Sequence, residues 1–137
     1  MNKEKAGYSS YGAGATDVAA PGGNGTTADC KRTVLSTLPG EAWGCLQGTS
    51  MASPHTAGVA ALIVSQFGRV GNDAGTLDVV MRPTQVESYL QSSVIDQGLP
   101  GYDECFGHGR INALRAVLQD TSKLYDAMAP YCPEYAE

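Results

Sequence analysis

The stretch GTSMASPHTAGVAAL, residues 48–62, has the composition of a helix that opens on a turn. Small and apolar residues follow Gly48, Thr49 and Ser50, so a long helix is expected to start at Ser50. No Asp, Glu, Lys or Arg occurs in residues 42–68. A helix that is apolar on all sides is typical of the interior of a larger body.

Ser50 stands where this helix is expected to begin, after a short strand and a glycine. The free backbone N–H groups of a helix N-terminus point outward there and stabilise negative charge, including the oxyanion that forms when a serine attacks a carbonyl. Gly48 has no side chain to obstruct another backbone. Pro54 is expected in the first turn, where its missing N–H costs least. The alternative is that Ser50 is a plain helix cap, and position alone favours that alternative.

The length and the charge of the chain exclude several classes of protein. Its 137 residues are enough for one ordinary domain at most, or for part of a larger one. Hydrophobic residues make up 42% and charged residues 17%, which is typical of a globular chain. A net charge of −5 argues against a protein that binds nucleic acid through phosphates. The apolar run at residues 57–64 is too short to span a membrane, and because residues 2–5 are polar no secretory leader is expected at Met1.

Four cysteines, Cys30, Cys45, Cys105 and Cys132, allow three disulfide connectivities. Two local bridges, Cys30–Cys45 and Cys105–Cys132, would suit an exported protein. Four free thiols in a reducing compartment are the alternative. No C-x-x-C spacing occurs and only two histidines are present, so no metal site is expected in this chain.

Short strands and helices are expected to alternate along the rest of the chain. Strands are expected at residues 17–20, 33–38 and 43–47, each followed by a glycine or proline turn. Residues 70–81 are expected to form a loop.

Two further helices are expected in the second half. One should run from Pro83 to about Ser92, with its proline near the first turn. The other should cover residues 111–118, where the apolar residues share one face: Ile111, Leu114, Val117 and Leu118. The tail at residues 122–137 is expected to be a short helix or irregular.

The segment at residues 48–62 resembles the nucleophile segment of the subtilisin-like serine peptidases. Three other stretches resemble that family in the same order along the chain. The first consists of YSSYG at residues 8–12 followed by DVAAPG at residues 17–22. The second is VLSTLPG at residues 34–40, and the third is GHGRINA at residues 107–113. The likeness runs from about Ala6 to about Leu118.

The resemblance implies roles for residues around the turn. Ser50 would be the attacking nucleophile, and its backbone N–H would form one half of the oxyanion hole. Met51 would pack beside the nucleophile, where the family is sensitive to oxidation. Leu46 and Gln47 would lie near the primed side of the substrate groove, and Gly48 and Met51 would also contact the substrate. The α/β-hydrolases, another class of serine enzyme, are excluded because their motif is Gly-x-Ser-x-Gly.

The two histidines are poor candidates for the catalytic base. His55 lies five residues after Ser50, so its side chain points about 140° away around the helix. We expect it to be a buried, hydrogen-bonded helix residue. His108 and Asp17 occupy positions that are structural in the family. The catalytic Asp and His and the oxyanion Asn of the family precede the part that resembles this chain, so this chain alone is expected to be inactive.

The resemblance implies an α/β fold with a mostly parallel sheet and helices on both faces, of which this chain would hold an incomplete, C-terminal portion. Residues 1–120 would belong to the peptidase domain and residues 121–137 would be a tail. The expected function is a secreted serine endopeptidase acting on polypeptides through an acyl-enzyme on Ser50. No cofactor is expected in this chain, although structural calcium would suit the complete domain.

No nucleic-acid or membrane partner is expected. The uncharged helix would normally be covered by the missing half of the domain, so the chain should expose apolar surface and pair with that half or with itself. The alternative function is an inactive fragment or a non-catalytic interaction module of the same fold.

Overall fold

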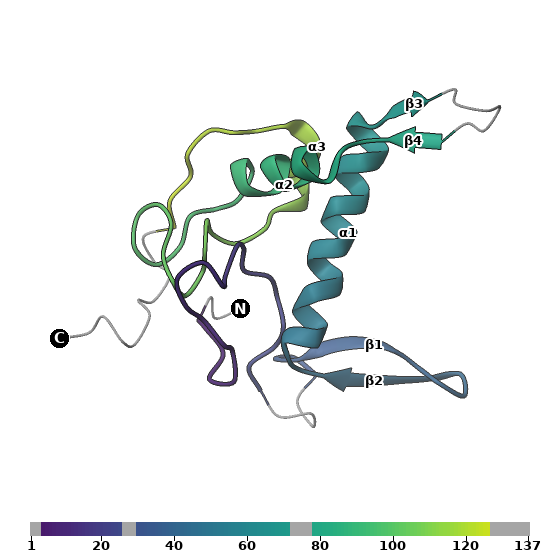
Figure 1. The fold of residues 1–137 in the computed structure, drawn as a ribbon. Coiled ribbons are helices and arrows are strands. Elements are labelled where there is room, and N and C mark those ends of the chain that lie inside the picture. The colour runs from purple at the N-terminus through teal and green to yellow at the C-terminus, as the bar shows by residue number, and fades with distance from the viewer. Residues whose placement is uncertain (1–3, 26–29, 72–77, 127–137) are drawn as a thin grey trace.

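The computed structural model describes residues 4–25, 30–71 and 78–126. One long helix, α1 (Thr49–Phe67), forms the axis of the molecule (Figure 1). The hairpin of β1 (Val34–Leu38) and β2 (Ala42–Leu46) lies at its N-terminal end. The hairpin of β3 (Arg69–Gly71) and β4 (Asp78–Val80) lies at its other end. Two shorter helices, α2 (Pro83–Ser92) and α3 (Ala113–Leu118), pack on one side of α1.

Both ladders are antiparallel hairpins, with Leu35 opposite Cys45 in the first and Arg69 opposite Val80 in the second. The strand expected at residues 17–20 forms isolated bridges instead of a ladder, an antiparallel one from Val18 to Gly107 and a parallel one from Ala19 to Arg110. The described part of the chain therefore mixes helices with small pieces of sheet. No helix in these ranges has both the length and the apolar character that crossing a membrane would need.

The core lies between α1 and the two shorter helices. Val59 and Ile63 of α1 are buried against Ile111 and Ala116. Partly buried apolar residues surround this cluster: Val18, Ala20, Phe67, Met81, Tyr89 and Leu90. The rings of Phe67 and Tyr89 meet at 4.9 Å between centroids and join α1 to α2. Burial of these side chains is the main force that fixes the two helices.

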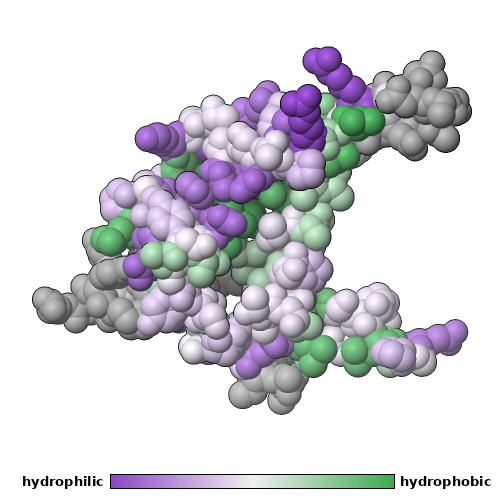
Figure 2. Space-filling model, viewed as in Figure 1, coloured by the Kyte–Doolittle hydropathy of each residue, from purple (hydrophilic) through white to green (hydrophobic). Residues whose placement is uncertain are grey.

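The rest of α1 is less buried than an apolar helix inside a complete domain. Among its described side chains, only Val59 and Ile63 are buried, and Leu62 is 47% exposed. The β1–β2 hairpin also exposes large apolar side chains, among them Leu35 and Trp43, which is 70% exposed. Figure 2 shows patches of hydrophobic residues on this hairpin. The expectation that this chain exposes apolar surface is met.

The prediction that Leu114 and Leu118 lie on the buried face of α3 is wrong. Leu114 and Leu118 are each 67% exposed, whereas Arg115 is buried. The helix begins at Ala113, and the Asn112 side chain caps it by accepting a hydrogen bond from the Arg115 N–H. The inner face accepts an arginine because its guanidinium donates hydrogen bonds to polar groups of other segments.

Arg115 ties α3 to two other segments. Its Nε donates to the Ser93 carbonyl at 3.1 Å, and one terminal nitrogen lies 2.9 Å from an Asp120 carboxylate oxygen. The other terminal nitrogen donates to the carbonyl of Ser122. Hydrogen bonds from the Ser122 hydroxyl and backbone, with a smaller contribution from Arg115, hold the pKa of Asp120 below its usual value. A buried cation with several partners is tolerated where an isolated one would not be.

The loop expected at residues 70–81 is also wrong in part, because β4 lies within it and β3 overlaps its start. Val70 of β3 pairs with Val79 of β4, and β-branched residues favour extended strands. The helix expected at residues 83–92 is confirmed, with Pro83 as its first residue.

Gly107 shows why a glycine is required where residues 107–111 pass the N-terminal segment. Its φ is +64°, and a Cβ built there would lie 2.2 Å from the Asp17 carbonyl oxygen. The His108 N–H donates to that same oxygen at 2.8 Å. Any side chain at residue 107 would separate two segments that the chain holds in direct backbone contact.

Candidate active site

Ser50 is exposed and is the second residue of α1. Gly48 is the N-cap residue, so the alternative that Ser50 caps the helix is wrong. The Met51 and Ala52 N–H groups donate to the Gly48 carbonyl at 2.9 and 3.2 Å. Within the described ranges no partner is seen for the Ser50 N–H, which belongs to the first turn of the helix and lacks a carbonyl one turn earlier.

Gly48 sets the direction in which the chain enters the helix. Its φ of 146° and ψ of 168° lie in a region that only glycine adopts without strain. A Cβ at residue 48 would meet no heavy atom closer than 3.8 Å, so backbone conformation and not space requires a glycine there. Another backbone does approach Gly48 closely, as expected. The glycine that makes room for this approach is Gly22, on the other segment, and not Gly48 itself.

Gly22 brings the N-terminal segment against the turn. The Gly48 N–H donates to the Gly22 carbonyl at 2.9 Å. A Cβ built on Gly22 would lie 2.8 Å from the Gly48 carbonyl oxygen and 3.3 Å from Ala52 Cβ. Two segments that are far apart in sequence therefore meet at the start of α1 through direct backbone contacts.

Tyr8 is a positioning residue that the sequence analysis did not single out. Its hydroxyl lies 2.8 Å from the Gly22 carbonyl oxygen and is also within hydrogen-bond distance of the Gly23 carbonyl. Burial raises the pKa of Tyr8 above its usual value, while the Gly48 backbone acts in the opposite direction. The phenol therefore stays protonated at neutral pH and remains a donor. Nothing in a single sequence pairs a tyrosine with a carbonyl fourteen residues later.

Met51 and His55, both on α1, face the β1–β2 hairpin. They line a groove of about 300 Å³ between α1 and β1, together with Val34, Leu35, Ser36 and Pro54. His55 is exposed, so the expectation of a buried histidine is wrong, since the described part of the chain leaves that side of α1 uncovered. His55 Nδ1 donates to the Met51 carbonyl at 2.8 Å, because a carbonyl oxygen can only accept.

Leu46 and Gln47 end β2 and lead into the turn. Leu46 is exposed, whereas the Gln47 side-chain oxygen is buried and has no hydrogen-bond partner. The structure therefore places Leu46, Gln47, Gly48 and Met51 on either side of Ser50 along one continuous stretch. His108 lies elsewhere, with its ring edge-on to Tyr102 at 5.3 Å.

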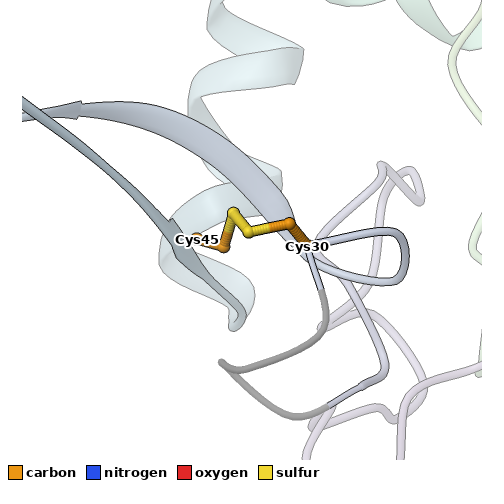
Figure 3. Close-up of a disulfide and its surroundings, with 2 residues drawn as sticks. All are labelled: Cys30 and Cys45. Atoms are coloured by element: carbon orange, nitrogen blue, oxygen red, sulfur yellow. A yellow bond between two sulfur atoms is a disulfide. The ribbon is translucent and has the colours of Figure 1, made fainter.

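A disulfide joins Cys30 to Cys45, with 5.4 Å between their Cα atoms (Figure 3). It connects β2 to the segment that precedes β1, a few residues before Ser50. This predicted bridge is therefore present. The predicted Cys105–Cys132 bridge lies outside the described residues, because Cys132 is not among them.

The described residues do not gather three or more His, Cys, Asp or Glu side chains into a group that could hold a metal ion. What the turn offers is an exposed hydroxyl on a helix N-terminus, beside a backbone N–H that is free to donate. That arrangement suits nucleophilic attack with stabilisation of an oxyanion.

The sequence and the structure of this chain are both similar to those of known proteases. A sequence profile of the subtilase family matches residues 1–109. M-protease of Shouchella clausii (strain KSM-K16) is 37% identical over 117 residues, which are 85% of this chain and 24% of that protein. Subtilisin BL of Lederbergia lenta is 34% identical over 117 residues, which are 85% of this chain and 35% of that protein.

A solved structure described as a lanthipeptide protease superposes with a TM-score of 0.58 at 29% identity, over 75% of this chain and 34% of that one. The chain thus spans about a quarter to a third of the length of these relatives.

Proposed function

This chain belongs to the subtilase family, and we propose that its Ser50 is the nucleophile of a serine endopeptidase. The observation that carries the proposal is the placement of Ser50. Its hydroxyl is exposed on the first turn of α1, and its own N–H is free within the described structure. A turn held by Gly48, Gly22 and Tyr8 keeps both groups in place.

The proposed reaction is acyl transfer. A histidine base removes the proton from the Ser50 hydroxyl as its oxygen attacks a peptide carbonyl, and the Ser50 N–H donates to the resulting oxyanion. The protonated base then gives its proton to the leaving amine, and water releases the acyl group by the reverse route. These steps need side chains and backbone amides only. Calcium, where the complete domain binds it, would be structural.

His55 is not proposed as the base. Its Nδ1 is engaged with the Met51 carbonyl, and five residues of helix turn its ring about 140° from Ser50. We propose that the base, its Asp partner and an oxyanion Asn belong to the part of a subtilase domain that this chain does not span. The chain by itself should therefore hydrolyse no peptide.

Other roles follow from the same proposal. Leu46, Gln47, Gly48 and Met51 would contact the substrate, and residues 1–120 would belong to the peptidase domain, followed by a tail at residues 121–137. We also propose export, which the Cys30–Cys45 disulfide supports. A protein named extracellular serine protease, from Serratia marcescens, is 35% identical over 83 residues, which are 61% of this chain and 7% of that protein.

The test is hydrolysis of casein by a complete domain, built as a chimera in which this chain replaces the matching region of M-protease. Ser50→Ala should abolish turnover, with a loss of about 10⁶, the value measured for the equivalent change in a subtilisin itself. Ser53→Ala removes another exposed hydroxyl from the same turn and should keep turnover within about threefold. Equal turnover of the Ser50→Ala chimera and the parent chimera would contradict the proposal.

A further inference from the structure

The Cys30–Cys45 disulfide fastens a reversal of the chain that precedes β1. Leu35 is the partner of Cys45 in the β1–β2 ladder and comes five residues after Cys30. A straight continuation of β1 would place Cys30 about 16 Å beyond Leu35. The Cα atoms of Cys30 and Cys45 lie only 5.4 Å apart, so residues 30–33 turn back onto β2 (Figure 3).

Arg32 belongs to this reversed segment and clasps Asn24. The Asn24 N–H donates to the Arg32 carbonyl at 3.0 Å. The Arg32 guanidinium donates to Asn24 Oδ1, through Nε at 3.2 Å and through a terminal nitrogen at 3.0 Å. Three hydrogen bonds thus join residue 24 to the segment that the disulfide fastens.

Residues 22–24 in turn hold the start of α1. The Gly22 carbonyl accepts a hydrogen bond from the Gly48 N–H at 2.9 Å. A Cβ built on Gly23 would lie 3.0 Å from Gln47 Cβ and 3.1 Å from the Arg32 carbonyl oxygen. Gly23 therefore packs against both tied segments at the point where they meet, two residues before the proposed nucleophile begins its turn.

The two cysteines differ in their accessibility. Cys30 is exposed, whereas Cys45 is 6% exposed. An external thiolate can therefore approach the disulfide from the side of Cys30. A small dithiol such as dithiothreitol supplies both electrons. It ends as its own disulfide, and Cys30 and Cys45 each take up one electron and one proton and become thiols.

We propose that Cys30 and Cys45 are positioning residues for Ser50, and that their bridge makes the activity of a complete domain sensitive to reducing dithiols. Reduction releases residues 30–33, and the loosening passes along the contacts between Arg32, Asn24, Gly22 and Gly48. The Ser50 hydroxyl then loses its fixed place, and a displacement of about 1 Å can lower turnover about 10²-fold. The effect on activity rests on the proposed role of Ser50, whereas the effect on the turn does not.

The first test measures amide hydrogen exchange in the 137-residue chain and does not depend on the nucleophile. The double variant Cys30→Ser/Cys45→Ala cannot form the bridge and keeps the other two cysteines. Its protection should fall at least about tenfold more at the Gly48 N–H than at the Ile111 N–H, the equivalent of one lost hydrogen bond. The Ile111 N–H is also bonded to the backbone of a distant segment, so a disulfide that stabilises only the chain as a whole would affect both amides equally.

Cys105→Ala/Cys132→Ala is the matched control, because it removes the other two cysteines. Cys105 is buried in a small cluster against which Ala19 packs, and the Ala19 carbonyl accepts the hydrogen bond from Ile111. This variant should lower protection at Ile111 at least as much as at Gly48.

The second test uses the chimera of this chain with M-protease, with its active sites counted by a fluorophosphonate probe. Dithiothreitol should lower casein turnover per counted site at least about tenfold, and reoxidation should restore it. The chimera carrying Cys30→Ser/Cys45→Ala should start at the lower turnover and should not respond to the dithiol. An inactive parent chimera would contradict the proposed role of Ser50, and the exchange result alone would then decide the role of the bridge.

Three results would overturn the proposal. They are equal losses of protection at Gly48 and Ile111 in the double variant, turnover per site that the dithiol leaves unchanged, or the same response to the dithiol with and without Cys30 and Cys45.

Discussion

Gly48 decides how the backbone enters α1 and therefore where the Ser50 hydroxyl points. Its φ and ψ of 146° and 168° are accessible without strain only to glycine. Gly48→Ala should lower the free energy of unfolding by about 1–3 kcal/mol. Urea unfolding followed by circular dichroism measures the change.

Gly58→Ala serves as the control within the same helix. A Cβ at Gly58 meets no heavy atom within 4 Å, so alanine should stabilise α1 by about 0.5–1 kcal/mol. A loss of unfolding free energy for Gly48→Ala and a gain for Gly58→Ala would support the requirement for glycine at the backbone angles of residue 48. A Gly48→Ala chain as stable as the parent would contradict it.

The sequence alone placed Ser50 at the start of a helix after a glycine, because strand, turn and helix signals are all local there. The contact between Gly22 and Gly48 was not predicted, since it depends on a tertiary approach between segments 26 residues apart. The exposure of His55 was also missed. Burial depends on what covers a helix, and that information lies outside the helix.

The sequence predicts Pro54 in the first turn of the helix, and this prediction is wrong. Pro54 is the sixth residue of α1. The helix begins one residue earlier than predicted, with Gly48 as its cap, and Pro54 falls in the second turn. Proline has no N–H to donate to the Ser50 carbonyl, four residues back. The helix is therefore weakened next to the proposed nucleophile.

Pro54→Ala should restore that hydrogen bond and stabilise the chain by about 2 kcal/mol. This is the helix penalty of proline reduced by the extra freedom of the unfolded chain. Pro83→Ala is the matched control, because Pro83 is the first residue of α2, where no N–H is needed. It should give no gain. A destabilised Pro54→Ala chain would show that the ring makes contacts worth more than the missing bond.

The ends of α2 could be predicted from sequence because Pro83 marks its start and its period is regular. The face of α3 could not. Apolar spacing pointed to Leu114 and Leu118, but the buried position went to Arg115, whose partners come from Ser93 and from residues 120–122. Hydrogen-bond partners supplied by other segments leave no mark on helical periodicity.

At the scale of the whole molecule, Arg115 links three segments across the sequence. Arg115→Met keeps the length of the side chain but leaves the Ser93 carbonyl without its donor, so unfolding free energy should fall by about 1–3 kcal/mol. Arg69→Met, at an exposed position, should change it by less than about 0.5 kcal/mol. Urea midpoints for the two variants decide the matter, and equal midpoints would refute the linking role.

The fold expected from the family resemblance, an incomplete subtilisin-like α/β domain, is confirmed by the relatives and by the superposed protease structure. Some of the short motifs carry a backbone requirement, as at Gly107, where a Cβ would collide with the Asp17 carbonyl. The exposed apolar surface follows from the same fact. The chain spans about a quarter to a third of the length of its relatives, and α1, whose composition is typical of a buried helix, is partly exposed here.

The most direct test of the central claim is to map the residue that a fluorophosphonate probe labels. The probe reacts with an activated serine, so the complete chimeric domain should carry one label, on Ser50, found by mass spectrometry of its peptides. The isolated 137-residue chain, for which we propose that no base reaches Ser50, should remain unlabelled under the same conditions. A label on Ser53 or on another residue of the folded chimera, or equal labelling after Ser50→Ala, would contradict the account.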